Sequence, residues 1–157
     1  MHTFSVFLPN EVATLALGAR CAALLCAPAT VYLQGNLGAG KTTFVRGLLR
    51  GLGHQGAVKS PTYALVESYR LPESNQTIHH FDLYRFHSPE EWEDTGLVEL
   101  FQEQALCLIE WSEQGGNCVP RADWLIELVR ENDGRRCTIT LANPNTKLQQ
   151  AFSQWQN

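Results

Sequence analysis

The apolar and polar positions of this chain alternate between strand-like and helix-like spacing. Short apolar or alternating runs predict strands at residues 4–8, 30–34, 64–71, 77–83, 105–109, 124–129 and 137–141. Helical spacing and capping residues predict helices from residue 11 to about 26, from 41 to about 52, from 89 to about 96 and after Pro144, with a further short one at 97–101. Strands that alternate with helices in this way are typical of an α/β fold.

The character of single strands indicates how the sheet is built. Residues 105–109 are continuously apolar, as expected of a parallel strand covered on both faces. Polar turns at 72–75 and at Asn132-Asp133-Gly134 predict two antiparallel hairpins. We therefore expect a P-loop NTPase-like three-layer sandwich, with a partly parallel central sheet and antiparallel additions, in a single domain that spans residues 1–157.

Two helix starts are well marked. Asn10 can cap the first helix, and Ser88 with Pro89 and Glu91 forms a capping box. The stripe that we expect the first helix to bury consists of Val12, Leu15, Ala16, Ala19, Ala22 and Ala23.

Between a predicted strand and a predicted helix lies a glycine-rich stretch with a defined chemistry. Residues 35–42 are Gly-Asn-Leu-Gly-Ala-Gly-Lys-Thr, which matches G-x-x-x-x-G-K-T, the phosphate-binding loop of nucleoside triphosphatases. The glycines let backbone N–H groups wrap a phosphate chain, Lys41 adds a positive charge, and the Thr42 hydroxyl is a ligand for Mg²⁺. The alternative is a glycine-rich turn that merely joins a strand to a helix.

Two carboxylates follow strand-like runs, Asp82 after residues 78–81 and Glu110 after the apolar run. Ligands of open α/β sheets lie at the carboxyl ends of parallel strands, so both acids are candidates for a site linked to a metal. Glu110 is the stronger candidate. The alternatives are an exposed acid at the strand end for Glu110 and an ion pair with Arg85 for Asp82.

The segment after the glycine-loop helix contains Lys59, Ser60 and Thr62, where nucleotide switches place a hydroxyl that senses the γ-phosphate. A plain Ser-Pro turn is the alternative. His79 and His80 cannot both face one site on a strand. His80 shares the face of Asp82, but a metal site made by that pair is the less favoured interpretation because a third ligand is not evident.

Composition restricts the possible functions. The 157 residues carry a formal net charge of −4, which argues against a protein whose main task is to grip DNA or other nucleic acid. The chain start lacks the features of a signal peptide and no apolar run approaches the length of a membrane span, so we expect a soluble cytoplasmic protein without a membrane partner. Cys21, Cys26, Cys107 and Cys137 lie among apolar neighbours and are expected in the core.

Four motifs in order resemble a known family. The glycine loop with Thr43, residues 58–63 (Val-Lys-Ser-Pro-Thr-Tyr), residues 80–85 (His-Phe-Asp-Leu-Tyr-Arg) and Glu110-Trp111 closely resemble the bacterial TsaE (YjeE) proteins over nearly the whole chain. The resemblance implies a small ATPase that acts with TsaB and TsaD and reaches tRNA indirectly, through that complex. These proteins make threonylcarbamoyladenosine at position 37 of tRNAs that read codons starting with A; the ATPase does not itself carry out the transfer.

The same resemblance implies the cofactors ATP and Mg²⁺ and a role for each matching residue. Thr42 and Glu110 would hold Mg²⁺, and Lys41, Thr43, Asp82 and Glu110 would support hydrolysis. ATP would be bound by Glu11, Gly38, Ala39, Gly40, Lys41, Thr42, Thr43, Thr62 and Arg135, of which Glu11 and Arg135 would touch the base. Residues 60–62 would act as a switch, and Trp111 occupies a motif position important to the family.

Other readings of the glycine loop remain open. A small-molecule P-loop kinase would need an arginine-bearing lid and an acceptor pocket, for which the short chain leaves little room. A GTP-binding switch would carry an N-K-x-D segment, which this sequence lacks. A purely structural nucleotide is the fourth possibility. For the ATPase interpretation we expect slow hydrolysis by the chain alone, because no arginine finger or strong general base is evident among the motif residues.

Overall fold

In the computed structural model, residues 2–155 are described; residue 1 and residues 156–157, the ends of the predicted domain, lie outside the described part. One seven-stranded sheet runs through the molecule in the order β1-β7-β6-β2-β5-β4-β3. The strands are β1 (His2–Leu8), β2 (Ala29–Gln34), β3 (Val66–Leu71), β4 (Gln76–Asp82), β5 (Ala105–Glu110), β6 (Trp124–Glu131) and β7 (Gly134–Leu141). The helices are α1 (Glu11–Ala22), α2 (Lys41–Gly51), α3 (Pro89–Asp94) and α4 (Thr146–Ser153), with 3₁₀ segments η1 (Leu97–Gln102) and η2 (Ser112–Cys118).

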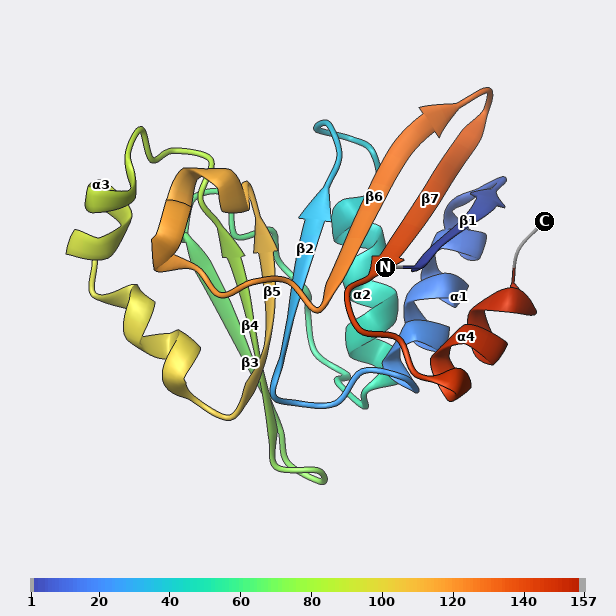
Figure 1. Cartoon of the computed structure of the whole chain (residues 1–157), viewed down its shortest axis with the longest axis horizontal. Helices are drawn as coiled ribbons and strands as arrows, with labels where there is room; N and C mark the ends of the chain where they lie inside the picture. The colour runs from blue at the N-terminus through green and yellow to red at the C-terminus, as the bar shows by residue number, and fades with distance from the viewer. Residues whose placement is uncertain (1, 156–157) are drawn as a thin grey trace.

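The sheet has a parallel centre and antiparallel flanks. Strands β6, β2, β5 and β4 pair in parallel, whereas β1 and β7 add an antiparallel flank on one side and β3 adds one on the other. Figure 1 shows α1 and α2 on one side of the sheet and α3 with η1 on the other. The predicted three-layer α/β sandwich, with its partly parallel sheet and both hairpins, is confirmed.

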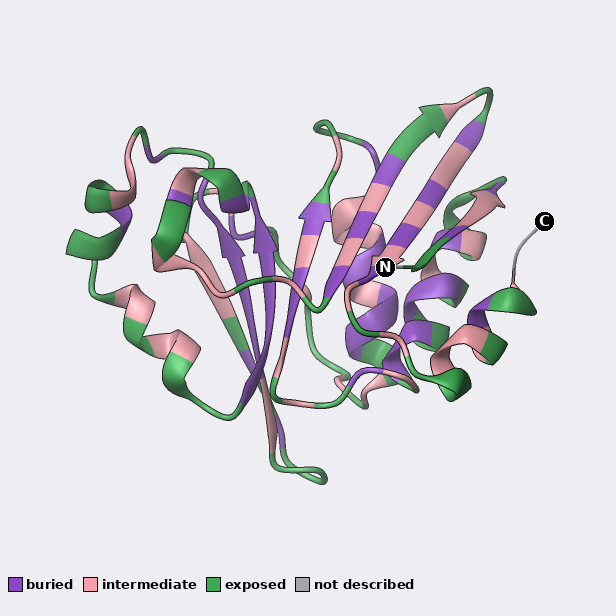
Figure 2. Cartoon of the chain, in the orientation of Figure 1, coloured by how far each residue is buried: buried purple, intermediate pink, exposed green. Residues whose placement is uncertain are grey.

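Strand β5 is the most protected element of the sheet. All six of its residues are buried, as the continuous apolar run predicts, and Figure 2 shows the contrast with the alternating burial of β6 and β7. On one side its apolar side chains join the core beneath α1 and α2. On the other they pack against Trp92 of α3, which is fully buried, and against Phe101 of η1. The strand that carries Glu110 is therefore fixed by packing on both faces.

Helices α1 and α2 pack with their backbones in close contact. A Cβ on Gly18 of α1 would lie 2.4 Å from the Phe44 carbonyl oxygen of α2, and a Cβ on Gly47 of α2 would lie 2.2 Å from the Leu15 carbonyl oxygen of α1. Side chains cannot be accommodated at either crossing point. The contact fixes α2, and with it the end of the glycine loop, against the first helix.

The first helix differs from the prediction in its length and in its buried face. It ends at Ala22, because the chain folds back in a turn that buries Leu25 before Pro28. The predicted stripe was wrong for most of its members: Val12 is 73% exposed, and Ala16, Ala19 and Ala23 are exposed. The buried residues are Thr14, Leu17, Gly18, Cys21 and Ala22. This face is selected by the close contact at Gly18, which apolar spacing does not report.

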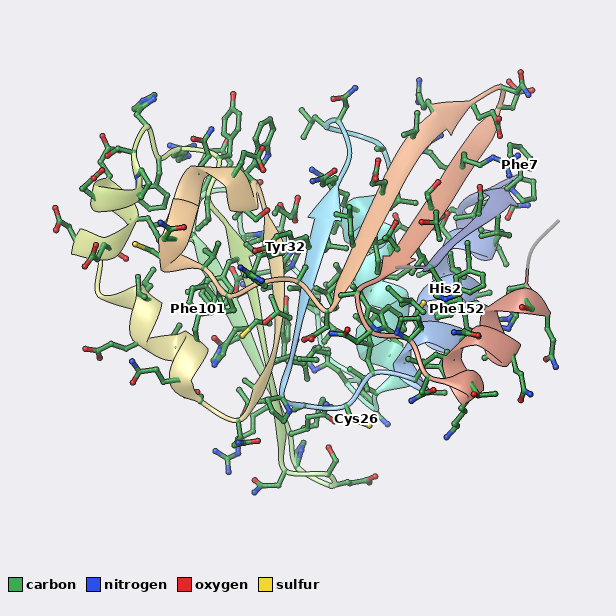
Figure 3. All side chains as sticks on the ribbon, in the orientation of Figure 1. His2, Phe7, Cys26, Tyr32, Phe101 and Phe152 are labelled. Atoms are coloured by element: carbon green, nitrogen blue, oxygen red, sulfur yellow. The ribbon has the colours of Figure 1, made fainter. Side chains whose placement is uncertain are left out.

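Of the cysteines expected in the core, Cys21, Cys107 and Cys137 are buried, but Cys26 is exposed and that expectation was wrong. Figure 3 labels Cys26 in the segment that joins α1 to β2. Burial raises the pKa of the Cys137 thiol to about 12, and burial with a contribution from Glu103 raises that of Cys107 to about 11.

Among residues 2–155, no helix is both long enough and apolar enough to cross a membrane.

We expect Gly47→Ala to destabilise the protein by about 2 kcal/mol. Helix propensity alone would favour Ala by about 1 kcal/mol, but overpacking against the Leu15 carbonyl oxygen costs about 1–3 kcal/mol and the contact is severe. Urea unfolding measures the difference, with Arg50→Ala on the exposed end of α2 as the control. A more stable Gly47→Ala protein would show that the helices do not pack this closely.

We also expect the thiols to differ in reactivity. Cys26 is exposed and should react first with a disulfide reagent at pH 8, whereas burial both shields Cys21 and Cys137 and raises their pKa, so these should react only on unfolding. Loss of the early phase in Cys26→Ser would confirm the assignment. Rapid modification of Cys137 in the folded protein would contradict the burial of this residue of β7.

Candidate functional site

The glycine loop connects β2 to α2 at the carboxyl end of the parallel strands. Gly40 caps α2 with φ of +104°, a left-handed conformation that glycine adopts without strain. The first hydrogen bond of the helix is donated by the Phe44 N–H to the Gly40 carbonyl oxygen at 2.9 Å. The amides of residues 41–43 therefore precede the intrahelical ladder, and their N–H groups with the helix dipole favour an anion.

The loop borders an open cavity of about 970 Å³. Its lining brings together segments that are far apart in the sequence: the start of α1, the glycine loop, the chain after α2, the ends of β4 and β5, and the β6–β7 turn. Predicted site residues that line the cavity are Glu11, Gly38, Gly40, Lys41, Thr42, Thr43, Ser60, Thr62, Asp82, Glu110, Trp111 and Arg135. Ala39, Lys59 and Pro61 of the predicted segments are not among the lining residues.

Glu110 lies between two nitrogen groups. Its Oε1 is 3.0 Å from Lys41 Nζ, and its Oε2 accepts a hydrogen bond from His80 Nε2 at 2.7 Å. Burial by itself would raise the pKa of Glu110, but the hydrogen bond and charge of His80, with the Lys41 ammonium, lower that pKa below its ordinary value. Glu110 is therefore a buried, ionised carboxylate at the end of β5, and the alternative of an exposed acid is wrong.

Asp82 lies beside Glu110 in the register of the parallel strands β4 and β5. Its Oδ1 accepts a hydrogen bond from the Tyr84 N–H at 2.9 Å, and its Oδ2 accepts one from Thr62 Oγ1 at 3.2 Å. Burial raises the pKa of Asp82, the charge of Glu110 adds to this, and the two hydrogen bonds oppose it only in part. The alternative ion pair with Arg85 is not formed, since the Arg85 guanidinium lies over the Tyr63 ring at 4.5 Å.

The segment after α2 reaches the site through a chain of hydroxyls. Ser60 Oγ is 2.9 Å from Thr62 Oγ1, which in turn donates to Asp82. Lys59 is not among the residues that line the cavity, and its backbone N–H donates to the Tyr69 hydroxyl at 3.1 Å. The structure thus brings two of the three predicted switch residues together with the β4 carboxylate.

Arg135 contacts the glycine loop itself. Its Nε donates to the Ala39 carbonyl oxygen at 2.9 Å, and its Nη2 donates to the Gly38 carbonyl oxygen at 3.0 Å. The Ala39 N–H is turned into the loop and donates to the Asn36 carbonyl oxygen. Glu11, which also lines the cavity, has its Oε1 3.6 Å from Arg46 Nη1 of α2. Contact of Glu11 or Arg135 with a base stays a prediction.

The donor set fits a nucleotide phosphate chain with Mg²⁺. Among the described residues no group of three or more His, Cys, Asp or Glu side chains could hold a metal alone. Mg²⁺ is usually held by one or two carboxylates together with substrate phosphates, and oxygen is its preferred ligand. Thr42 and Glu110 contribute oxygen atoms to the lining of the cavity. The amides after Gly40, together with the Lys41 ammonium, would hold the phosphates.

Two features of the site were not predicted from the sequence. The contact of His80 with Glu110 was missed, although the period-two pattern correctly placed His80 on the face of Asp82. The aromatic mouth of the cavity was also missed. Tyr84 and Trp111 lie with ring centroids 5.0 Å apart, and Trp111 adopts a positive φ of 58°. A non-glycine residue in this region is uncommon and no sequence signal reports it.

Comparisons with known proteins give the same family over most of the chain. A family model described as threonylcarbamoyl adenosine biosynthesis protein TsaE matches residues 8–138. The chain is 43% identical over 159 residues to the tRNA threonylcarbamoyladenosine biosynthesis protein TsaE of Haemophilus influenzae, which covers 98% of this chain and 99% of that protein. It is 41% identical over 112 residues to the TsaE protein of Treponema pallidum, which covers 71% and 80% of the two chains.

A solved structure also matches. The crystal structure of YdiB from Bacillus subtilis superimposes with a TM-score of 0.76 at 26% identity and covers 98% of this chain and 94% of that chain. The similarity in fold extends across the glycine loop, both carboxylate strands and the flanking hairpins. The chain therefore belongs to the TsaE family, whose members are proteins of tRNA threonylcarbamoyladenosine biosynthesis.

Proposed function

We propose that this protein binds ATP with Mg²⁺ and hydrolyses it slowly, as a subunit that works with TsaB and TsaD in the transfer of threonylcarbamoyl to adenosine 37 of tRNAs that read codons starting with A. One observation carries the proposal: the glycine loop, Lys41 and two carboxylates on adjacent parallel strands line one cavity. Family membership supports the pathway, and the site supports the nucleotide chemistry.

Phosphate binding would come from the backbone and from Lys41. The amides at the start of α2 and the helix dipole attract the phosphate oxygens, and Lys41 adds a charge that is held in the cavity by Glu110 at 3.0 Å. The Thr42 hydroxyl and the Glu110 carboxylate would hold Mg²⁺, which would neutralise negative charge on the phosphates.

We propose that the carboxylate of Asp82 orients a water molecule for attack. It is held on both oxygens, by the Tyr84 N–H and by the Thr62 hydroxyl, so its direction is fixed. Thr62 in turn belongs to the segment that contains Ser60, so a change in this segment would move the hydrogen-bond donor of Asp82. This coupling supports a switch role for residues 60–62.

We expect slow turnover because the arginines that line the cavity are already engaged in other contacts. Those on the described surface of the cavity are Arg85, whose guanidinium stacks on Tyr63, and Arg135, which donates to loop carbonyl oxygens. Both guanidinium groups are thus engaged within the protein, so neither is available as an arginine finger. In other nucleoside triphosphatases an arginine finger contributes a large part of the rate of hydrolysis. A partner protein could supply such a group, and this supports a subunit that is stimulated by TsaB and TsaD.

The proposal is tested by measuring ATP hydrolysis of the purified chain with and without TsaB and TsaD, beside a threonylcarbamoyl-transfer assay on tRNA. We expect Lys41→Ala to weaken ATP binding by about ten-fold or more, because hydrogen bonds to charged groups contribute about 1.5–3 kcal/mol, and to abolish partner-dependent turnover. Lys147→Ala, which alters an exposed lysine of α4 outside the cavity, should behave as wild type. ATPase activity that survives in Lys41→Ala, or tRNA modification that proceeds without the chain, would refute the proposal.

Glu110→Ala should separate binding from turnover. The backbone amides and Lys41 remain, so nucleotide binding without metal should persist, while Mg²⁺-dependent hydrolysis should fall by about a hundred-fold or more if the carboxylate holds the ion. Titration calorimetry and a phosphate-release assay measure the two quantities, with the exposed Glu113→Ala as the matched control. Equal loss of both quantities, accompanied by a lower unfolding temperature, would point to a structural role instead.

A further inference from the structure

His80 is a buried side chain with one unpartnered nitrogen. It is 0% exposed on β4, which lies between β5 and the edge strand β3, and its Nε2 lies 2.7 Å from Glu110 Oε2. Among the described residues, its Nδ1 and Trp92 Nε1 are the buried side-chain nitrogen or oxygen atoms that have no hydrogen-bond partner. An unpaired buried polar atom costs about 1–3 kcal/mol, so a purely structural role would favour an apolar residue here.

The adjacent residue on the same strand shows a different arrangement. His79 points to the other face of the sheet, where Nδ1 is 2.7 Å from Ser68 Oγ and Nε2 is 3.0 Å from Glu103 Oε1. Both nitrogens of His79 are therefore partnered, as is usual for a buried histidine. His80 has a partner on one side only, and that partner is the carboxylate of the candidate metal site.

The hydrogen bond determines which way the Glu110 carboxylate faces. An ionised carboxylate only accepts hydrogen bonds, so His80 Nε2 carries the hydrogen and the bond engages Oε2. The other oxygen, Oε1, is directed to the cavity side, where Lys41 Nζ lies at 3.0 Å. His80 is buried and Lys41 borders the cavity, so the contact from His80 is the one that does not have to change when phosphate is bound.

We propose that His80 is a positioning residue that holds Glu110 Oε2 through its Nε2–H and so presents Oε1 to the Mg²⁺ that accompanies the nucleotide. The inference rests on the proposed function. Groups that orient a metal-binding side chain are worth about ten- to a hundred-fold in metal affinity. His80 would act through Glu110 and would touch neither nucleotide nor metal.

The test compares two amides at position 80. The amide nitrogen of Gln can reach the place of Nε2 and donate to Glu110, whereas that of Asn lies near the place of Nδ1 and cannot. Titration calorimetry with a non-hydrolysable ATP analogue, with and without Mg²⁺, gives the factor by which Mg²⁺ strengthens binding. We expect His80→Asn to reduce this factor by about ten-fold or more, His80→Gln to preserve most of it, and both to bind the metal-free analogue as wild type does.

The neighbouring histidine provides the matched control. His79→Gln and His79→Asn alter a buried histidine on the same strand and should leave the Mg²⁺ factor unchanged even if they lower the unfolding temperature. A full Mg²⁺ factor in His80→Asn, or an equal loss in His80→Gln and His80→Asn, would overturn the inference. A wild-type protein whose analogue binding does not respond to Mg²⁺ would instead overturn the proposed function itself.

A measurement on the wild-type chain does not depend on the folding of any variant. Long-range ¹H–¹⁵N spectra report which ring nitrogen of a histidine carries hydrogen. We expect the hydrogen of His80 on Nε2 in the free protein and in the complex with Mg²⁺ and the analogue. An unprotonated Nε2 in the complex would overturn the inference, since the nitrogen could not then donate to Glu110.

Discussion

The site depends on the parallel pairing of β4 with β5, which sets Asp82 directly beside Glu110. Burial raises the pKa of Asp82, and repulsion from the Glu110 carboxylate at the end of the adjacent strand adds to this. Lys41, at the start of α2, is the lysine that lines the cavity beside these two carboxylates, and its ammonium group contacts Glu110. Two acids beside one lysine at the ends of these strands are suited to a further cation, and a divalent ion bound with phosphate would supply it.

The site also requires a glycine loop that is held rigidly next to these two strands. The loop follows β2, which pairs with β5, and it opens α2, whose backbone lies against that of α1 at Gly18 and Gly47. On the outer side, Arg135 holds two carbonyl oxygens of the loop from the β6–β7 hairpin. The antiparallel flank is therefore part of the phosphate-binding machinery that we propose, because it fixes the direction of the loop peptides.

Much of this arrangement could be predicted from the sequence, and the failures share a physical cause. The succession of strand, glycine loop and helix along the chain, the buried β5 and the acids at the strand ends all follow from local patterns, which report burial and turns. The buried face of α1 does not, because helical spacing fits more than one face and the close approach at Gly18 decides between them. The exposure of Cys26 does not either, because α1 ends at Ala22 and Cys26 lies in the segment that follows. His80 shows the same limit: its face was predicted, but its contact with Glu110 depends on the pairing of two distant strands.

The arrangement of charges also explains why such a site would need partners. Arg85 lies over Tyr63 and Arg135 is committed to the loop, so on the described lining Lys41 is the cation left for the phosphates. Binding requires only this lysine, the amides and a metal, whereas fast phosphoryl transfer also requires charge that is added in the transition state. Meanwhile Tyr63, Tyr84 and Trp111 keep 84%, 56% and 37% of their surface exposed at the mouth of the cavity. A surface of this kind at the mouth of the proposed nucleotide site would suit a docking protein that completes the site, which fits the slow unaided hydrolysis that we propose.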